Sequence, residues 1–246
     1  MTSVSSDWTA RLGRFGVWRP AGLLTPEIAV AVEQLGYGTL WVGGSPSADL
    51  RIVEDLLAAT SRVMIASGVV NMWTAPAPEV AQSYHRIEEA YPGRFLLGVG
   101  IGHPEATKEY HSPYATMVEY LDRLDEAGVP VERRVLAALG PKALRLAASR
   151  TAGAHPYLVP VEHTRWAREI VGTGPLLAPE HKVIVDIEAD QARAIAHNAV
   201  ARYLRLRNYT NNLRRFGYGD ADLAGEGSDR LVDTLAVHGN AEIAAR

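Results

Sequence analysis

The sequence contains no cysteine, so disulfide bonds, thiolate nucleophiles and zinc–thiolate sites are excluded. It has no excess of positive charge for binding nucleic acid, because 25 Lys and Arg face 28 Asp and Glu, a net charge of −3. No stretch approaches the roughly 18 uninterrupted apolar residues of a membrane span. The polar start, residues 1–14, lacks the basic-then-apolar pattern of a secretion signal. We therefore expect a cytoplasmic protein that binds neither nucleic acid nor membranes.

The chain has 246 residues, of which 47% are apolar and 22% charged. This is enough to bury a large core, as one barrel-sized domain or as two small domains. Because no Pro-, Gly- or Ser-rich joint interrupts the sequence, we predict a single domain over residues 1–246.

Short apolar runs alternate with stretches of helical period along the chain. Most runs are continuously apolar, which is typical of parallel strands covered on both faces. The runs are 15–18, 39–42, 63–67, 95–99, 135–139, 157–159 and 183–185. Seven strand–helix units without a linker favour a (β/α)8 TIM barrel, which typically takes about 250 residues, over an open doubly wound sheet.

The intervening helices have clear start and stop residues. Thr25 is placed to cap a helix with Pro26 in its first turn, and Gly36 ends it. Residues 190–246 read as helices with no eighth strand, and residues 241–246 resemble a helix cut in mid-course. The barrel is therefore either left open or completed beyond this sequence; we favour completion, because an open barrel exposes unpaired strand edges.

Glycines gather where predicted strands end, which is where barrels carry their sites. Gly98, Gly100 and Gly102 alternate around the fourth exit and would let a flat ring or a phosphate approach the backbone. Alternatively, they only relieve crowding. A G-x-G-x-x-G dinucleotide motif fails because His103 occupies the third glycine position. At residues 140–142, Gly-Pro-Lys starts a helix that is either an anion site or a plain helix start.

The eight histidines show no metal-ligand spacing. His103 and His155 lie at strand ends, where an imidazole can transfer protons near neutral pH, although a structural role is the alternative for each. No nucleophile elbow is present. Trp18, Trp41 and Trp73 are candidate walls of a site or core residues. A long helix is predicted over residues 190–216, with Tyr203 and Tyr209 on its packing stripe. Its five arginines between residues 202 and 215 favour a solvated helix face over an acidic partner.

Four motifs in order resemble the luciferase-like monooxygenase superfamily, and within it the coenzyme F420-dependent oxidoreductases of actinobacteria. They are GYGTLW at 36–41, SGVVN at 67–71, GRFLLGVGIG at 93–102 and LGPK at 139–142. The resemblance implies a homodimeric TIM barrel with a deazaflavin or flavin at its carboxyl-terminal mouth, and a cis peptide bond at Gly68–Val69. The cofactor-binding residues that it implies are Gly68, Val69, Asn71, Gly100, Ile101, Gly102, Gly140, Pro141 and Lys142.

This sequence departs from the family in two places. Gly43-Gly44 stands where many relatives have an acidic residue or histidine, and His103 lies near the glutamate that donates a proton in sugar-phosphate-oxidising relatives. We therefore expect an F420-dependent oxidoreductase acting on an unidentified small molecule, with His103 as proton donor and His155 second. The alternatives are an FMN-dependent luciferase-like monooxygenase and a non-catalytic cofactor-binding homologue. A sugar-phosphate isomerase would need a strand-end carboxylate base that we do not find.

Overall fold

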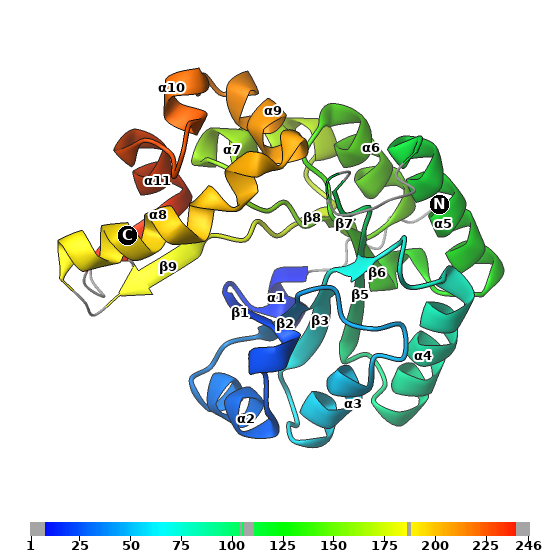
Figure 1. Cartoon of the computed structure of the whole chain (residues 1–246). Coiled ribbons are helices and arrows are strands. Elements are labelled where there is room, and N and C mark those ends of the chain that lie inside the picture. Colours follow the sequence, from blue (N-terminus) through cyan, green and yellow to red (C-terminus); the bar gives the residue numbers. More distant parts are fainter. Residues whose placement is uncertain (1–7, 104, 106–110, 186–187, 240–246) are drawn as a thin grey trace.

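The computed structural model describes residues 8–103, 105, 111–185 and 188–239. One curled parallel sheet, in the order β1-β2-β3-β5-β6-β7-β8 with β4 beside β5, forms most of a barrel (Figure 1). Its strands are β1 (Gly16–Pro20), β2 (Thr39–Gly43), β3 (Met64–Gly68), β4 (Val70–Asn71), β5 (Phe95–Gly100), β6 (Arg134–Leu136), β7 (Gly153–Ala154) and β8 (Leu176–Leu177). This confirms the predicted α/β barrel class. No strand in the described ranges joins β8 to β1, so the barrel is open there.

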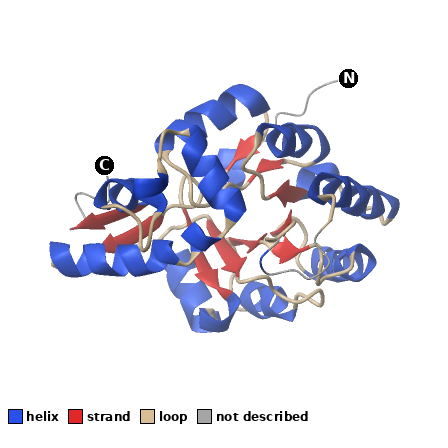
Figure 2. Ribbon diagram, turned by 45° about the horizontal axis from the view of Figure 1, so that its top comes forward, coloured by secondary structure: helices blue, strands red, loops and turns tan. Residues whose placement is uncertain are grey.

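Helices cover the outer face of the sheet (Figure 2). They are α2 (Pro26–Gln34), α3 (Arg51–Ala58), α4 (Ala77–Ala90), α5 (Pro113–Glu126), α6 (Pro141–Arg150) and α7 (Val161–Val171). The predicted cap is present, because Oγ1 of Thr25 accepts a hydrogen bond from the N–H of Ile28 at 3.4 Å. Gly36 has a φ of 84° just beyond α2, a conformation that glycine adopts without steric cost. These helices bury their apolar faces against the sheet in the main core.

A second, smaller core fills the inside of the curled sheet. Short helix α1 (Trp8–Leu12) packs Trp8 and Leu12 against inward-facing residues of the strands, including Trp41. The hydroxyl of Thr39, the first residue of β2, donates a 2.6 Å hydrogen bond to the carbonyl oxygen of Leu12. Helix α1 therefore closes the interior at the amino-terminal ends of the strands, and any cavity must lie at the other end.

The later part of the chain differs from the sequence prediction. The sixth strand is β7, upstream of the predicted 157–159, and residues 182–185 form β9 (Lys182–Val185) outside the barrel sheet. Strand β9 pairs in parallel with β10 (Ala236–Gly239), so the all-helical prediction for residues 190–246 is wrong there. Residues 241–246, predicted as a cut helix, lie outside the described residues. The long helix predicted over 190–216 is broken into α8 (Ala189–Ala201), the 3₁₀ turn η4 (Tyr203–Arg205) and α9 (Arg207–Arg215).

The C-terminal helices have an apolar core of their own. Helices α8, α9, α10 (Asp220–Leu223) and α11 (Asp229–Leu235) pack with the β9–β10 pair as a block beside the half-barrel (Figures 1 and 2). The core residues include Val200, Leu213 and Leu231, all of them fully buried. No helix in the described part of the chain is long and apolar enough to cross a membrane.

Candidate functional site

A cavity of about 560 Å³ lies at the carboxyl-terminal ends of the strands. Its floor consists of residues in β4 and at the ends of β3, β5 and β6: Gly68, Val69, Asn71, Gly100, Ile101, Gly102, Ala137 and Ala138. Its roof comes from the broken helix of the C-terminal block: Arg202, Tyr203, Leu206, Asn208 and Tyr209. Trp18, Tyr157 and Glu180 lie on the wall between them. The volume is typical of small-molecule and cofactor sites.

The structure brings most of the predicted site residues to this one cavity. Residues 68, 69, 71, 100, 101 and 102 line it, together with His103 and His155. Gly140, Pro141 and Lys142 do not line it, and this part of the prediction does not match the cavity. The first turn of α6 presents Ala143 to the cavity, while the Lys142 side chain is exposed at the rim. The N-terminus of α6 has no side-chain cap, so its N–H groups remain suited to an anion at that rim.

The Gly68–Val69 peptide bond is cis, as the family resemblance implies. The Gly68 carbonyl oxygen accepts a 2.9 Å hydrogen bond from Nε1 of Trp18. The Trp18 ring lies so close over Gly43 that a Cβ atom there would stand 2.0 Å from its Cζ2 atom. The glycine that replaces the family's polar residue at this exit therefore makes room for an indole wall.

The alternating glycines of β5 are explained by crowding. A Cβ atom on Gly98 would lie 1.9 Å from the carbonyl oxygen of Ser67. On Gly100 it would lie 2.7 Å from the Val69 side chain. Gly102 has a φ of 66°, and a Cβ atom there would be 3.0 Å from the amide nitrogen of Asn71. Of the two explanations that the sequence left open, close packing accounts for both glycines: Gly98 against Ser67 of β3, and Gly100 against Val69 and Ala137.

His155 is buried in a fixed orientation. Its Nδ1 atom lies 2.7 Å from the carbonyl oxygen of Ala178, which can only accept, so Nδ1 carries the proton. The ring stacks on Trp41 with centroids 4.2 Å apart, and Nε2 lies beside Gly68. Burial lowers the pKa of His155 to about 4, although the hydrogen bond to Ala178 opposes this. At neutral pH the ring is therefore uncharged and offers Nε2 as a hydrogen-bond acceptor.

His103 links the floor to the roof. Its Nδ1 atom lies 3.2 Å from Oδ1 of Asn208, and its ring contacts the ring of Tyr209 at a centroid distance of 5.2 Å. Burial lowers the pKa of His103, while the hydrogen bond to Asn208 and the charge of Glu105 act in the opposite direction. The hydrogen bond to Asn208 orients the imidazole, and its neutral form is favoured near pH 7.

The aromatic roof and wall of the cavity were not predicted from the sequence. The rings of Tyr157, Tyr203 and Tyr209 meet edge to face, with centroids 4.9 to 5.6 Å apart. The ammonium group of Lys182 lies 5.0 Å from the centre of the Tyr157 ring. The buried Tyr157 hydroxyl has no hydrogen-bond partner of acceptable geometry among the described residues. A buried polar atom of this kind on a cavity wall fits a ligand that supplies the missing partner.

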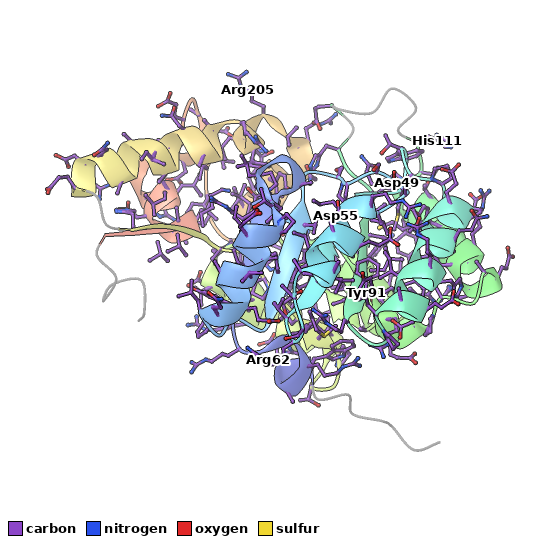
Figure 3. All side chains as sticks on the ribbon, turned by 90° about the horizontal axis from the view of Figure 1, so that it is seen from below. Asp49, Asp55, Arg62, Tyr91, His111 and Arg205 are labelled. Carbon is purple, nitrogen blue, oxygen red and sulfur yellow. The ribbon has the colours of Figure 1, made fainter. Side chains whose placement is uncertain are left out.

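Glu180 was also missed as a site residue. The apolar run at 183–185 predicts a strand that begins after Glu180, whereas the barrel strand is β8 and Glu180 follows it. Arg202 lies at the cavity mouth, but Arg205 in η4 points away from the molecule (Figure 3). The arginine-rich segment is thus mainly a solvated face. Among the described residues, no group of three His, Asp or Glu side chains is placed to hold a metal ion.

Comparison with known proteins gives a partial match to one family model and a shared fold. Residues 24–128 match the family model described as luciferase-like monooxygenase. A curated relative, the uncharacterized protein YwcH of Bacillus subtilis (strain 168), is 33% identical over 86 residues. That match covers 31% of this chain and 25% of the relative, so the chain matches only about a quarter of that relative's length.

Solved structures share the fold over nearly the whole chain. An F420-dependent secondary alcohol dehydrogenase in complex with an F420–acetone adduct superposes with a TM-score of 0.70 at 14% identity, covering 93% of this chain and 86% of that one. The F420-dependent tetrahydromethanopterin reductase of Methanopyrus kandleri superposes with a TM-score of 0.65 at 14% identity, covering 93% of this chain and 87% of that one. The FMN-bound oxygenating constituent of 3,6-diketocamphane monooxygenase of Pseudomonas putida superposes with a TM-score of 0.64 at 14% identity, covering 89% of this chain and 79% of that one.

The fold is the one that these dehydrogenase, reductase and monooxygenase structures share. Residues 24–128 match the luciferase-like monooxygenase family model, in agreement with the resemblance that the sequence motifs carry. Both F420-dependent and FMN-containing enzymes share this fold.

Proposed function

We propose that this protein is an F420-dependent oxidoreductase that transfers a hydride between the deazaflavin and a small organic substrate. The observation that carries the proposal is the convergence of three strand exits on one cavity of about 560 Å³. That volume accommodates a flat ring system together with a small substrate. Two F420-dependent enzymes among the structural neighbours support the choice of cofactor.

The residues present fit such a ring. The side chains of Val69 and Ile101 offer apolar contacts on the floor, and Trp18 covers one wall and excludes water. When bound, the cofactor would supply the hydride chemistry. The uncapped start of α6 and the exposed Lys142 would hold its phosphate at the rim.

The two histidines would orient the ligand. Burial lowers the pKa of both His103 and His155, so near pH 7 neither carries the additional proton that an acid releases. We therefore propose hydrogen-bonding roles for them instead of the proton-donor roles expected from the sequence. The variant His103→Ala tests this: weaker ligand binding is expected, whereas normal binding with a large loss of turnover alone would restore the proton-donor role.

Fluorescence titration of the purified protein with F420 and, separately, with FMN tests the cofactor assignment. Saturable F420 binding is expected, and absence of binding by both cofactors would reject the function. Lys142→Ala should weaken F420 binding by about tenfold, equivalent to about 1.4 kcal/mol. The matched control is Arg145→Ala, an exposed residue on the same helix. The phosphate-free deazaflavin riboside should bind Lys142→Ala and the unaltered protein equally. If the variant also binds the riboside more weakly, Lys142 does not hold the phosphate.

An FMN-dependent monooxygenase is the second candidate. The matching family model and the FMN-bound neighbour favour it. Oxygen consumption by the reduced, cofactor-loaded protein would distinguish it, because a deazaflavin does not activate oxygen. A non-catalytic cofactor-binding homologue is a third candidate, favoured by the open barrel, and it would bind cofactor without turning over a broad substrate panel. We also propose the homodimer that the resemblance implies, which sedimentation analysis would test.

A further inference from the structure

Glu180 is held at the carboxyl-terminal edge of the barrel by its backbone. It follows β8, and its N–H donates a 2.9 Å hydrogen bond to the carbonyl oxygen of Pro156. It also forms an isolated parallel bridge with Tyr157. Both residues line the cavity. The backbone position of Glu180 is therefore fixed by strand pairing, which supports a site residue more rigidly than a loop does.

The Glu180 carboxyl group has no close partner of its own. Within the described ranges it accepts no hydrogen bond, and no Lys, Arg or His nitrogen lies within 4.0 Å of its oxygens. Glu54, in contrast, is paired with both Arg51 and Arg86 at 2.9 Å. A carboxylate removed from water without such partners loses stability in its charged form. Burial accordingly raises the pKa of Glu180 to about 7, although the positive charge of Lys182 acts against this.

Titratable groups face Glu180 from each neighbouring element. Burial raises the pKa of the Tyr157 and Tyr209 phenols, so both stay protonated. Burial also lowers the pKa of His155 to about 4, so that ring stays neutral. The groups around Glu180 are His155 and Tyr157 beyond β7, Lys182 in β9, Arg202 and Tyr203 at η4, and Tyr209 in α9.

We propose that Glu180 is the catalytic acid–base residue of this cavity. When a substrate carbonyl is reduced, hydride from the reduced cofactor bonds to the carbon, and the C=O π electrons take the proton of the Glu180 carboxyl. A C–H and an O–H bond form, the cofactor loses two electrons, and Glu180 is left as a carboxylate. In alcohol oxidation the carboxylate takes the proton back. The assignment rests on the proposed function and names its proton-handling residue.

Infrared titration of the protein without cofactor tests the proton-holding part alone. The difference between the unaltered protein and Glu180→Gln should show a protonated-carboxyl band that disappears as the pH rises through about 7. Glu162→Gln is the matched control, because the Glu162 side chain is 61% exposed on α7. Absence of the band between pH 5 and pH 9 would overturn the proposal, whatever the cofactor.

Kinetics with reduced F420 and acetone or cyclohexanone test the transfer itself. Because the acid must be protonated, kcat for ketone reduction should fall as the pH rises through about 7. The kcat for alcohol oxidation should rise over the same range. In Glu180→Gln this pH dependence should disappear and kcat should fall by about 10²–10⁴-fold, while the affinity for F420 stays unchanged. Unchanged kcat and an unchanged pH profile in Glu180→Gln would refute the proposal. If the unaltered protein binds neither F420 nor FMN, the proposed function fails instead; if it binds but turns over neither ketone, the infrared titration decides.

Discussion

Gly98→Ala is expected to lower the free energy of unfolding by about 3–5 kcal/mol. The added Cβ atom would stand 1.9 Å from the Ser67 carbonyl oxygen, whereas real Cβ contacts stay beyond 3.0 Å. Strands β3 and β5 must therefore separate by about 1 Å. That movement breaks two buried hydrogen bonds of 2.8 Å, in which the Ser67 hydroxyl joins both backbone groups of Gly98. Each is worth about 1 kcal/mol, and overpacking adds about 1–3 kcal/mol.

Urea unfolding followed by tryptophan fluorescence measures this loss. Gly174→Ala is the control, because no atom lies within 4 Å of its added Cβ, and it should change stability by at most about 0.5 kcal/mol. Ser67→Ala, which removes the hydroxyl without adding bulk, should cost about 2–3 kcal/mol. Because Ser67 directly precedes Gly68, Gly98→Ala and Ser67→Ala should both also weaken cofactor binding. A loss below about 1 kcal/mol for Gly98→Ala would refute the crowding explanation of this glycine.

Three further predictions concern stability. Burial raises the pKa of Glu33, but hydrogen bonds from consecutive N–H groups at residues 61–63 outweigh this and lower the pKa to about 2. The contribution of Glu33 to the free energy of unfolding is therefore present above the ordinary pKa of 4.5 and lost as the pH falls through about 2. Glu33→Gln should flatten the acid-unfolding curve in that window. Arg134 is fully buried and paired with Asp125, so Arg134→Met should cost about 3–5 kcal/mol in urea unfolding. Trp18→Phe removes the hydrogen bond to Gly68 and should cost about 1 kcal/mol and loosen cofactor binding in fluorescence titration.

Long apolar runs made the first half of the barrel predictable. The run at 95–99 became β5, and the glycine-rich exits beside it reached one cavity, because the carboxyl ends of parallel strands share one edge. Strands β7 and β8 have two residues each, too few to show a hydrophobic period. Missing β8 placed Glu180 at the wrong end of a strand. An error of a few residues in one element therefore removed a site residue from the prediction.

The roof was not predictable from spacing. Tyr203 and Tyr209 fit the packing stripe of one long helix in the sequence, but the chain turns at η4 and lays both rings over the cavity. That turn depends on packing against residues distant in the sequence, such as Leu158. Likewise, the alternation of Gly98 and Gly100 suits two explanations, and only the position of the neighbouring strand decides between them.

The two walls of the cavity are anchored in different places. Ile101 and Ala138 on the floor pack against the main core of the barrel, whereas Tyr203, Leu206 and Tyr209 overhead pack within the separate core of the C-terminal block. Mild denaturant or a cavity-forming change in the C-terminal block would release the ligand while the strands beneath kept their pairing. We therefore expect ligand affinity and barrel stability to change separately, with two opening events in hydrogen exchange.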